Sequence, residues 1–343
     1  MTIEKQAQDF ETMLDSAEKV TIISHFNPDG DAIGSAVGMR EFLAAKGQDA
    51  RIIMPSPEPA FLSFLDPDDT IIYFSENKEL AKSIINDSDL IVCLDFNKPE
   101  RTEWMSGTLI SAKAEKVMID HHLHPAGDIF SIVISDPEAS STCELLYRIL
   151  MAFSYTEGDP YRLGLTVLTA LAAGLLTDTN NFNNSVTPYT FTAAASMLQA
   201  GVDFDYLNNM LFKRFSESRM RLMGHLLKDS MILYPGLKAS FMTMTMDDRT
   251  AYGIQDGDTE GFVNLPLMIH DVEISAFFSE TPDFIKVSLR SKGHVSVNSL
   301  ARKFFNGGGH ERAAGGRLYI PISDVRGYFV ESLEQFLLEN GKI

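Results

Sequence analysis

A histidine and two aspartates fall within seven positions in the stretch HFNPDGDAIG, which begins at His25. The side chains of His25, Asp29 and Asp31 are of the types that bind divalent metal ions. The same stretch also has the composition of a surface turn, and Asp31 is suited to cap a helix over 32–46. It does not fit an EF-hand calcium loop, because no glutamate falls at the twelfth position of a loop starting at Asn27 or Asp29. Taken alone, the stretch leaves a helix cap and half of a metal site as alternatives.

Three other places in the chain carry candidate ligands at the ends of apolar runs. LIVCL is followed by Asp95, KVMI by Asp120, His121 and His122, and LTALAAGLLT by Asp178. Each has a simpler explanation by itself: a strand-end cap, surface histidines, or a loop residue after a helix. A carboxylate at the end of a helix is opposed by the helix dipole unless a cation is near. It is the coincidence of all of them at element ends that favours a metal site.

The segments before these residues have the pattern of buried strands and covering helices. Residues 19–26 and 87–97 contain nearly continuous apolar runs, typical of a parallel sheet covered on both faces. Residues 31–47 have apolar side chains at helical spacing and end at Gly47, a suitable C-cap. Further strands are expected at 49–55 and 115–122, and further helices at 141–153 and 161–179. We therefore predict an α/β domain with a doubly wound, mostly parallel sheet.

In an open parallel sheet, sites form beyond the carboxyl ends of the strands, so these clusters are expected to converge on one edge. Crowded carboxylates and imidazoles repel one another or lose solvation unless something neutralises them. A divalent metal does so, and without thiolates the mixed oxygen and nitrogen ligands suit Mn²⁺, Mg²⁺ or Zn²⁺. If six of these eight side chains hold two ions, a carboxylate that bridges both ions is implied. Two neighbouring ions clamp the attacking and leaving oxygens of a phosphoryl centre, so the pattern indicates phosphoester hydrolysis.

The second half of the chain has a different pattern. Residues 188–229 are helical and charged, and strands return from about 230 in LKASFMTMTM, VEISAFFSE, FIKVSLRSK and GGRLYIPI. Helical patterns separate or follow these strands, which is typical of an α+β domain. We predict a catalytic domain over 1–190, a helical linker over 191–229 and a smaller α+β substrate-binding domain over 230–343.

A basic segment stands out in this second domain. Residues 286–317 carry seven lysines and arginines and a single acid, a local charge of +6 in a chain of net charge −18. The contrast predicts a patch for an anionic ligand. In the GGGH run, Gly308 and Gly309 would let backbone N–H groups approach a phosphate because no Cβ blocks the way. A plain turn is the alternative for the glycines, and a solvated helix face is the alternative for Arg302 and Lys303.

Bulk properties exclude several classes of protein. The net charge of −18 argues against tight, non-specific binding of long nucleic acid. No apolar run is long enough to span a bilayer, and the N-terminus lacks the apolar core of a secretory signal. Cys93 and Cys143 form no CxxC pair, so neither a disulfide framework nor a thiolate metal site is expected. We expect a two-domain cytoplasmic protein.

Taken together, these residues resemble the DHH phosphoesterase family. The DHH at 120–122 is the signature that names the family, HFNPDGDAIGSA looks like its first motif, VCLDF its second and GLLTDT its fourth. The second half resembles the DHH-associated C-terminal domain, whose mark is GGGHERAAGG at 307–316. The segment VSLRSKGHVSVNSLA and the chain length look like the nanoRNase / pAp phosphatase branch. The resemblance covers nearly the whole chain.

The resemblance implies two divalent ions, Mn²⁺ in preference to Mg²⁺. His25 and Asp29 would hold one ion and Asp31 the other, with Asp95 bridging both. His121 and Asp178 would complete the ligands of the second ion. Asp120 would orient its neighbours, and His122 would face the scissile phosphate and stabilise transition-state charge. The residues expected to contact substrate are Arg290, Ser291, Gly308, Gly309, His310 and Arg312.

One position departs from the family pattern. The family often has a glycine soon after the aspartate of the fourth motif, whereas Asn180 and Asn181 follow here. Asparagine tolerates the left-handed backbone region better than most residues, so the turn can still form.

The implied activity is hydrolysis of short oligoribonucleotides from one end, together with removal of the 3′-phosphate from 3′-phosphoadenosine 5′-phosphate (pAp) to give AMP. A phosphodiesterase of linear or cyclic dinucleotides, such as pApA and cyclic di-AMP, is the main alternative. A pyrophosphatase, a long-strand exonuclease and a nucleotide-binding regulatory module with an inactive site are less favoured. The expected partners are short RNA substrates and, in a homodimer, a second copy of the chain, but neither a membrane nor a long duplex.

Overall fold

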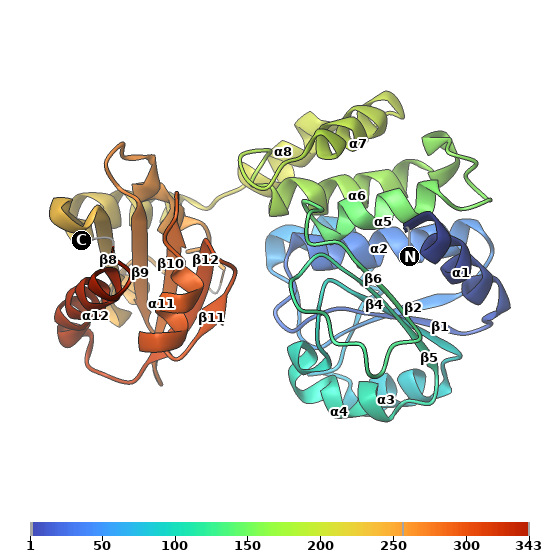
Figure 1. Ribbon diagram of the computed structural model, residues 1–343, viewed down its shortest axis with the longest axis horizontal. Coiled ribbons are helices and arrows are strands. Elements are labelled where there is room, and N and C mark those ends of the chain that lie inside the picture. Colours follow the sequence, from blue (N-terminus) through green and yellow to red (C-terminus); the bar gives the residue numbers. More distant parts are fainter. Residues whose placement is uncertain (1–2, 256, 342–343) are drawn as a thin grey trace. The chain divides into compact units, whose positions relative to one another are not determined.

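The computed structural model describes residues 3–255 and 257–341. The chain divides into two compact units, Met1–Arg214 and Phe215–Ile343, each built around its own sheet (Figure 1). The predicted linker residues, 191–229, are divided between these two units. The domain limits 1–190, 191–229 and 230–343 stay a prediction.

The first unit contains a parallel six-stranded sheet. Its strand order is β3-β2-β1-β4-β5-β6, and every neighbouring pair is parallel. The strands are β1 (Val20–Ile23), β2 (Ala50–Met54), β3 (Ile72–Tyr73), β4 (Leu90–Leu94), β5 (Glu115–Asp120) and β6 (Ile132–Ser135). The order changes direction between β1 and β4, which is where open α/β sheets form a crevice for ligands. The predicted doubly wound fold is confirmed.

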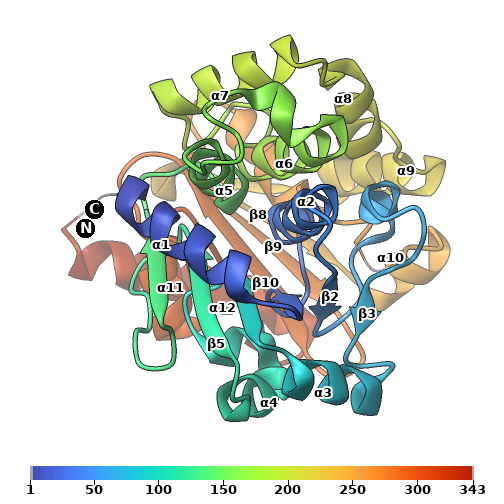
Figure 2. The ribbon, with the colours of Figure 1, turned by 90° about the vertical axis from the view of Figure 1, so that its right-hand side faces the viewer.

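Helices cover both faces of this sheet (Figure 1). One face is covered by α1 (Ile3–Ser16), α2 (Gly30–Ala45), α5 (Thr142–Met151) and α6 (Leu165–Asp178). The other face is covered by α3 (Lys78–Asp87) and α4 (Ser106–Ser111). Two further helices, α7 (Pro188–Gln199) and α8 (Phe204–Phe212), pack on the side of α6 away from the sheet (Figures 1 and 2).

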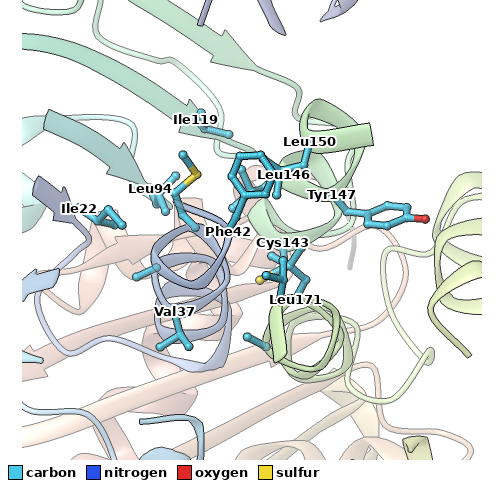
Figure 3. Packing of buried hydrophobic residues seen from close by; sticks show 14 of the residues in the cluster. Ile22, Val37, Phe42, Leu94, Ile119, Cys143, Leu146, Tyr147, Leu150 and Leu171 are labelled. Carbon is cyan, nitrogen blue, oxygen red and sulfur yellow. The ribbon is translucent and has the colours of Figure 1, made fainter. Parts of the chain in front are cut away.

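Successive side chains of a strand point to opposite faces of the sheet, so each strand contributes to the hydrophobic cores on both faces. In β1, Ile22 packs with α2, α5 and α6, whereas the next residue, Ile23, packs with α3 and α4. Figure 3 shows Ile22, Leu94 and Ile119 of the strands beside the helices of the first face. Full burial of each such side chain contributes about 1.5–3 kcal/mol to folding.

Two glycines allow α2 and α6 to approach closely. A Cβ on Gly34 would collide with the Ala170 carbonyl oxygen, and a Cβ on Gly174 would meet the Cys143 sulfur and the Asp31 backbone. The close contact brings the first turn of α2 against α6 and α5, and Asp31 lies in that turn.

The second unit contains a mixed six-stranded sheet of order β11-β12-β10-β9-β8-β7, in which only the β8–β9 pair is parallel. The strands are β7 (Ile232–Tyr234), β8 (Ala239–Met244), β9 (Ile274–Glu280), β10 (Ile285–Ser291), β11 (Gly308–Gly309) and β12 (Ala313–Leu318). On one face lie α11 (Val297–Phe304) and α12 (Val325–Glu339). On the other lie α9 (Glu217–His225) and the 3₁₀-helix Phe262–Met268, with the short helix α10 (Met246–Ala251) following β8. The predicted smaller α+β domain is confirmed as a fold.

Among the helices within 3–255 and 257–341, none is both long enough and apolar enough to cross a membrane.

Candidate metal centre

The carboxyl ends of β1, β4 and β5 bring the predicted ligands together at the β1/β4 crevice. His25 lies two residues beyond the end of β1, and Asp95 directly follows β4. Asp120 is the last residue of β5, with His121 and His122 next in the chain. The N-terminal end of α2 contributes two aspartates and the C-terminal end of α6 one, namely Asp29, Asp31 and Asp178.

His25 is oriented as a metal ligand would be. Its Nδ1 lies 2.9 Å from the Phe26 carbonyl oxygen, which can only accept, so Nδ1 carries the proton and Nε2 presents a lone pair when the ring is neutral. The side chain is buried, and Nε2 has no hydrogen-bond partner among the described residues. The nearest carboxylate oxygens are Asp95 Oδ2 at 3.4 Å and Asp29 Oδ1 at 3.9 Å. An unpartnered buried nitrogen facing carboxylates is a deficit that a metal ion would remove.

The cap of α2 is Asp29, and the expectation that Asp31 caps this helix is wrong. Asp29 has an extended backbone (φ −98°, ψ −167°), and its Oδ1 accepts from the N–H groups of Asp31 at 3.0 Å and Ala32 at 3.1 Å. The helix therefore begins at Gly30, earlier than the sequence suggested. Asp31 already has a helical position, so its carboxylate cannot cap its own helix.

Asp31 instead receives the N-terminus of a different helix. Its Oδ2 accepts from the Thr142 N–H at 2.6 Å and its Oδ1 from the Cys143 N–H at 2.8 Å, in the first turn of α5. Burial raises the pKa of Asp31 to about 7, and the negative charge of Asp95 adds to the rise. The charge of His121 and the backbone hydrogen bond from Cys143 oppose this shift without cancelling it. The carboxylate thus lacks enough positive charge in the protein alone.

Asp95 lies between the two halves of the site. Its Oδ2 is 3.4 Å from His25 Nε2, and its Oδ1 is 3.7 Å from His121 Nε2 and 3.8 Å from His122 Nδ1. Burial alone would raise its pKa, but the contact with His25 and the charges of the other two rings outweigh burial and hold the pKa far below the usual range. Thr142 Oγ1 donates to Asp95 Oδ1 at 3.0 Å. The backbone of Asp95 is left-handed (φ 64°), a strained conformation typical of functional sites.

His121 and Asp178 close the other side of the site. His121 Nε2 lies 3.3 Å from Asp178 Oδ2 and 3.9 Å from Asp31 Oδ2. Its Nδ1 faces the Ala139 carbonyl oxygen at 3.3 Å, an arrangement that turns Nε2 toward the carboxylates. Burial raises the pKa of Asp178 well above its usual range, and the charges of three neighbouring aspartates raise it further.

Asp120 holds His122. His122 Nδ1 donates to Asp120 Oδ1 at 2.7 Å, and the His122 backbone N–H donates to Asp120 Oδ2 at 3.1 Å. The Asp120 carboxylate is fully buried, so both bonds fix the ring from within the fold. Because Nδ1 donates to Asp120, a metal ion or substrate would contact this ring through Nε2.

The ligand atoms fall into three groups in which all atoms lie within 4.8 Å of one another. The groups are His25, Asp29 and Asp95; Asp31, His121 and Asp178; and Asp95, His121 and His122. The unpartnered Nε2 of His25 and the raised pKa values of Asp31 and Asp178 are deficits that cations would remove. A donor set of carboxylate and imidazole without thiolate suits Mn²⁺, Mg²⁺ or Zn²⁺. The residues present therefore fit divalent metal ions.

The turn after Asp178 survives the departure from the family pattern. Asn180 and Asn181 have φ values of 47° and 56°, in the left-handed region. The Asn181 N–H donates to the Leu176 carbonyl at 2.8 Å and the Asn180 N–H to the Thr177 carbonyl at 3.1 Å. This is a Schellman ending, so asparagine supplies the turn that glycine provides elsewhere.

Sequence reasoning missed the start of α5 as part of the site. Ser141 caps this helix by accepting from the Glu144 N–H at 2.9 Å, and the next two residues donate to Asp31. A signal was present in the run SSTCE, which has the serine cap and the glutamate three positions later that mark a helix start. The pattern does not reveal which carboxylate faces that start.

In the second unit, register places Arg290 and His310 on one face of the sheet. Arg290 of β10 pairs with Ala313 of β12. His310 and Ala313 exchange backbone hydrogen bonds of 2.7 and 3.3 Å, so His310 lies opposite Ala313 from the other side. Paired residues in antiparallel strands project to the same face, with the small Ala313 between the two larger side chains. Burial lowers the pKa of Arg290, a desolvation that a bound anion would offset.

The glycine run has a packing role, and the expected cradle of N–H groups is not formed by Gly309 and His310. The Gly309 N–H donates to Asn298 Oδ1 at 3.0 Å and the His310 N–H to the Ala313 carbonyl at 2.7 Å. A Cβ on Gly309 would meet the Ala313 carbonyl oxygen, so glycine is needed for β11 to approach β12. Gly308 pairs with Gly315 in the same ladder.

The other residues predicted to contact substrate or to form the basic patch differ in burial and in hydrogen-bond partners. Ser291 is buried, and its hydroxyl donates to the Val295 carbonyl at 2.7 Å. Arg312 is exposed in the turn between β11 and β12. Lys292 donates to the carbonyls of Leu267 and Ile269, each at 3.0 Å. The seven bases of 286–317 therefore do not form a single patch for ligand, because Lys292 is engaged within its own unit.

Comparison with known proteins identifies the family of this chain. The chain matches the models of the DHH family, N-terminal domain, over 19–175 and of the DHHA1 domain over 239–339. It is 30% identical to the bifunctional oligoribonuclease and PAP phosphatase NrnA of Thermus thermophilus, over 87% of this chain and 84% of that protein. The protein of the same name from Bacillus subtilis is 28% identical, over 88% and 90% of the two chains.

A longer relative and solved structures extend the comparison. The cyclic-di-AMP phosphodiesterase PdeA of Listeria monocytogenes is 24% identical over 96% of this chain, which spans 49% of that protein. The crystal structure of an exopolyphosphatase-related protein from Bacteroides fragilis has a TM-score of 0.93 and 35% identity, covering 97% of this chain and 96% of that one. RecJ from Thermus thermophilus in complex with Mn²⁺ shares the fold at a TM-score of 0.54 and 14% identity, over 97% of this chain and 54% of that one.

Proposed function

This chain belongs to the DHH family, and from that premise we propose that it is a metal-dependent phosphoesterase that hydrolyses short oligoribonucleotides and converts pAp to AMP. The observation that carries the proposal is the position of Asp95 between His25 and His121, with further carboxylates on both sides. It is supported by the likeness to two proteins named oligoribonuclease and PAP phosphatase over most of both chains.

In this proposal two of the ligand groups hold one ion each. His25, Asp29 and Asp95 would hold the first. The second would be held by Asp31, His121 and Asp178, with Asp95 shared between the two ions. When bound, two divalent ions supply Lewis-acid charge to a phosphoryl centre and acidify water. Mn²⁺ is the preferred ion and Mg²⁺ the second choice.

The chain's own residues preorganise this centre. The α5 N–H groups hold the Asp31 carboxylate in place, and the Thr142 hydroxyl holds Asp95. Asp120 directs the His122 ring, whose protonated form offers Nε2–H to a phosphoryl oxygen as charge develops. Fixed donors of this kind need no reorganisation during reaction, which is the main source of electrostatic catalysis.

The second unit is proposed to bind the substrate. The guanidinium of Arg290 suits a phosphate because its planar N–H groups can donate in pairs. His310, on the same face, would donate to the phosphate or stack on a base, while Ala313 leaves room between them. Arg312, which is exposed in the turn between β11 and β12, would be a further contact to a substrate phosphate. Ser291, Gly308 and Gly309 would contribute through the backbone shape that their bonds within the unit maintain.

One alternative has a specific observation in its favour. The likeness to PdeA extends over 96% of this chain, so a linear or cyclic dinucleotide is the competing substrate. This chain spans about half of that protein's length. We also propose a cytoplasmic location, which the two unpaired buried thiols Cys93 and Cys143 fit, and a homodimer, which solution measurement of the mass would test.

The deciding experiment is a substrate panel. Labelled oligoribonucleotides of graded length, pAp, pApA and cyclic di-AMP are each incubated with the full chain and either Mn²⁺ or Mg²⁺. Release of mononucleotides from the shortest RNAs and of AMP from pAp is the expected result. Activity on cyclic di-AMP alone would support the alternative function, a dinucleotide phosphodiesterase. Inactivity on every substrate with both ions would refute the proposal of a phosphoesterase.

A further inference from the structure

The chain's only tryptophan lies exposed beside the metal centre. Trp104 belongs to the 3₁₀ segment Pro99–Met105, which begins four residues after Asp95. Its side chain is 60% exposed. The indole contacts the Phe26 ring edge to face, with centroids 5.0 Å apart and planes inclined at 73°.

Hydrogen bonds connect this segment to the first metal ligand. The Phe26 N–H donates to the Arg101 carbonyl at 2.8 Å. The Phe26 carbonyl in turn accepts from His25 Nδ1, the bond that aims Nε2 at the carboxylates. Trp104 is therefore separated from a predicted ligand by a single intervening residue, Phe26, which contacts both.

Buried residues and a hydrogen bond fix the segment that carries Trp104. Pro99, Thr102 and Met105 are buried, and the Thr102 hydroxyl donates to the Pro99 carbonyl at 2.7 Å. Glu103 has φ 48° and ψ −118°, a backbone conformation that is costly for any residue with a Cβ. The buried residues on both sides hold this strained residue, and the residue after it, Trp104, is exposed.

The same segment carries Arg101, whose guanidinium suits the phosphate group of a nucleotide. The Arg101 side chain is exposed, its positive charge acts on His25, and no ion pair found within 3–255 and 257–341 includes it. The chain has a net charge of −18, so an arginine outside any ion pair is a suitable partner for a phosphate group. Arg101 lies close to the proposed metal ligand His25, because its carbonyl accepts from the N–H of Phe26. A flat apolar ring and a guanidinium on one short segment therefore fit a base and its phosphate.

We propose that Trp104 stacks on a nucleobase of the oligonucleotide bound at the metal centre, while Phe26 supports the indole by its edge and Arg101 pairs with a neighbouring phosphate. The inference rests on the proposed function, because it requires a nucleotide substrate. Stacking on an aromatic face accepts every base, so this contact selects nucleotides over base-free phosphoesters without selecting sequence. It also makes Trp104 a substrate-binding residue, contributed by the catalytic unit itself.

The first test needs no substitution. Since Trp104 is the only tryptophan, intrinsic emission reports on this one ring. The full chain is titrated with AMP and, separately, with ribose 5-phosphate, in the presence of Mn²⁺. AMP is expected to quench the emission saturably, and ribose 5-phosphate is expected to leave it unchanged. Equal responses to both compounds, or no response to AMP, would overturn the proposal.

The second test separates stacking from folding and from chemistry. Trp104→Ala is expected to raise KM for a diribonucleotide about tenfold with little change in kcat, and Trp104→Phe is expected to restore most of the loss. Hydrolysis of ribose 3,5-bisphosphate, which has no base, should be equal in all three proteins. Tyr161→Ala, which alters another exposed aromatic of the same unit, is the matched control and should behave as the unaltered chain.

The outcomes distinguish this inference from the proposed function. If the unaltered chain hydrolyses dinucleotides and Trp104→Ala has the same KM, stacking is refuted and the phosphoesterase stands. If the unaltered chain hydrolyses none of the panel, the phosphoesterase is refuted, and the AMP titration still decides whether the indole binds a base. An equal rise of KM for the base-free substrate would overturn stacking, because Trp104 would then act on the fold of the loop instead.

Discussion

The Asp31 carboxylate and the Thr142 backbone N–H lie 2.6 Å apart, although 111 residues separate them in the chain. The bond joins the first turn of α2 to the first turn of α5, and both residues are almost fully buried. A helix N-terminus carries partial positive charge, so it stabilises an anion that it faces. The pKa of Asp31 nevertheless stays raised to about 7, so the helix alone does not replace a metal ion. This helix start is therefore part of the metal centre.

Removal of the Thr142 hydroxyl is expected to weaken the centre without abolishing it. Thr142→Val leaves the N–H bond to Asp31 but deletes the 3.0 Å bond to Asp95. Loss of a bond that orients a metal ligand lowers metal affinity or activity about 10- to 100-fold. Activity measured against Mn²⁺ concentration reports the change. Thr142→Ser should restore it, and Thr192→Val, on the exposed face of α7, should match the unaltered chain. A Thr142→Val variant with an unchanged Mn²⁺ requirement would contradict this role.

Replacement of Asp95 is expected to abolish turnover. The carboxylate faces His25 on one side and His121 on the other, so its loss removes a ligand from both proposed ions. Calorimetric titration of Asp95→Asn with Mn²⁺ should show fewer than the two ions expected of the unaltered chain. Asp68→Asn changes an exposed carboxylate of the same unit and serves as the control. Substantial activity in the Asp95 variant would refute a shared carboxylate.

Arg290→Ala is expected to raise KM for dinucleotides far more than it alters Mn²⁺ binding. A hydrogen bond from a charged donor is worth about 1.5–3 kcal/mol, which corresponds to a rise of tenfold or more. Steady-state kinetics at saturating Mn²⁺ give the split between KM and kcat. Lys303→Ala removes a base of the same unit that already pairs with Glu339. A KM shared by the unaltered chain and Arg290→Ala would exclude this arginine from substrate binding.

Gly307→Ala is expected to destabilise the second unit. A Cβ at this position would collide with the Gly315 carbonyl oxygen of the facing strand, and backbone yields less readily than a side chain. Overpacking of this kind costs about 1–3 kcal/mol. Thermal unfolding followed by circular dichroism measures the effect. Gly327→Ala, within α12 and with open space around its Cβ, should instead stabilise by up to about 1 kcal/mol. Equal unfolding temperatures for the two variants would refute the packing role.

Asp66 is expected to make stability depend on pH in acid. Its buried carboxylate accepts from the Thr70 hydroxyl at 2.6 Å and from Arg40 at 2.9 Å. It also accepts from the Thr70 and Ile71 N–H groups at 2.7 and 2.9 Å. Burial would raise its pKa, but these partners outweigh burial and lower it. Because the folded pKa is below the unfolded value of about 3.9, the stabilisation is present above about pH 4 and is lost as pH falls through the folded pKa.

The corresponding measurement compares Asp66→Asn with the unaltered chain. At pH 7 the variant should be less stable by about 1–3 kcal/mol, since an amide cannot accept all of these bonds. The difference should shrink as the pH is lowered below about 4. A difference that stays constant over this range would show that charge at Asp66 contributes nothing.

Much of the fold and the ligand set followed from local patterns. Apolar runs of strand length predicted β1, β4 and β5, because a strand buried on both faces needs apolar residues at every position. Parallel strands end at a common edge, so residues directly after them had to be near one another. Short strands at the sheet edge, such as β3 with two residues, carry too little pattern to predict.

Tertiary structure alone decided the contacts that tune the site. The backbone angles at Asp29 made it the cap of α2 and left Asp31 to the start of α5, a choice that spacing could not make between two aspartates in one turn. Strand register, which depends on packing of the whole sheet, placed Arg290 and His310 around Ala313.

In the GGGH run, too, the sequence determined one property and the tertiary structure decided another. The sequence determined that these residues could approach another group closely, since glycine has no Cβ. The structure decided that the group approached is the neighbouring strand, because the Gly309 and His310 N–H groups already have partners within the unit. Composition and spacing therefore determined which side chains are available as metal ligands and which positions allow close approach. These properties depend only on residue type and on neighbours within a few positions. Which atom faces which depends on the packing of distant elements, because a displacement of a few ångströms exchanges one hydrogen-bond partner for another.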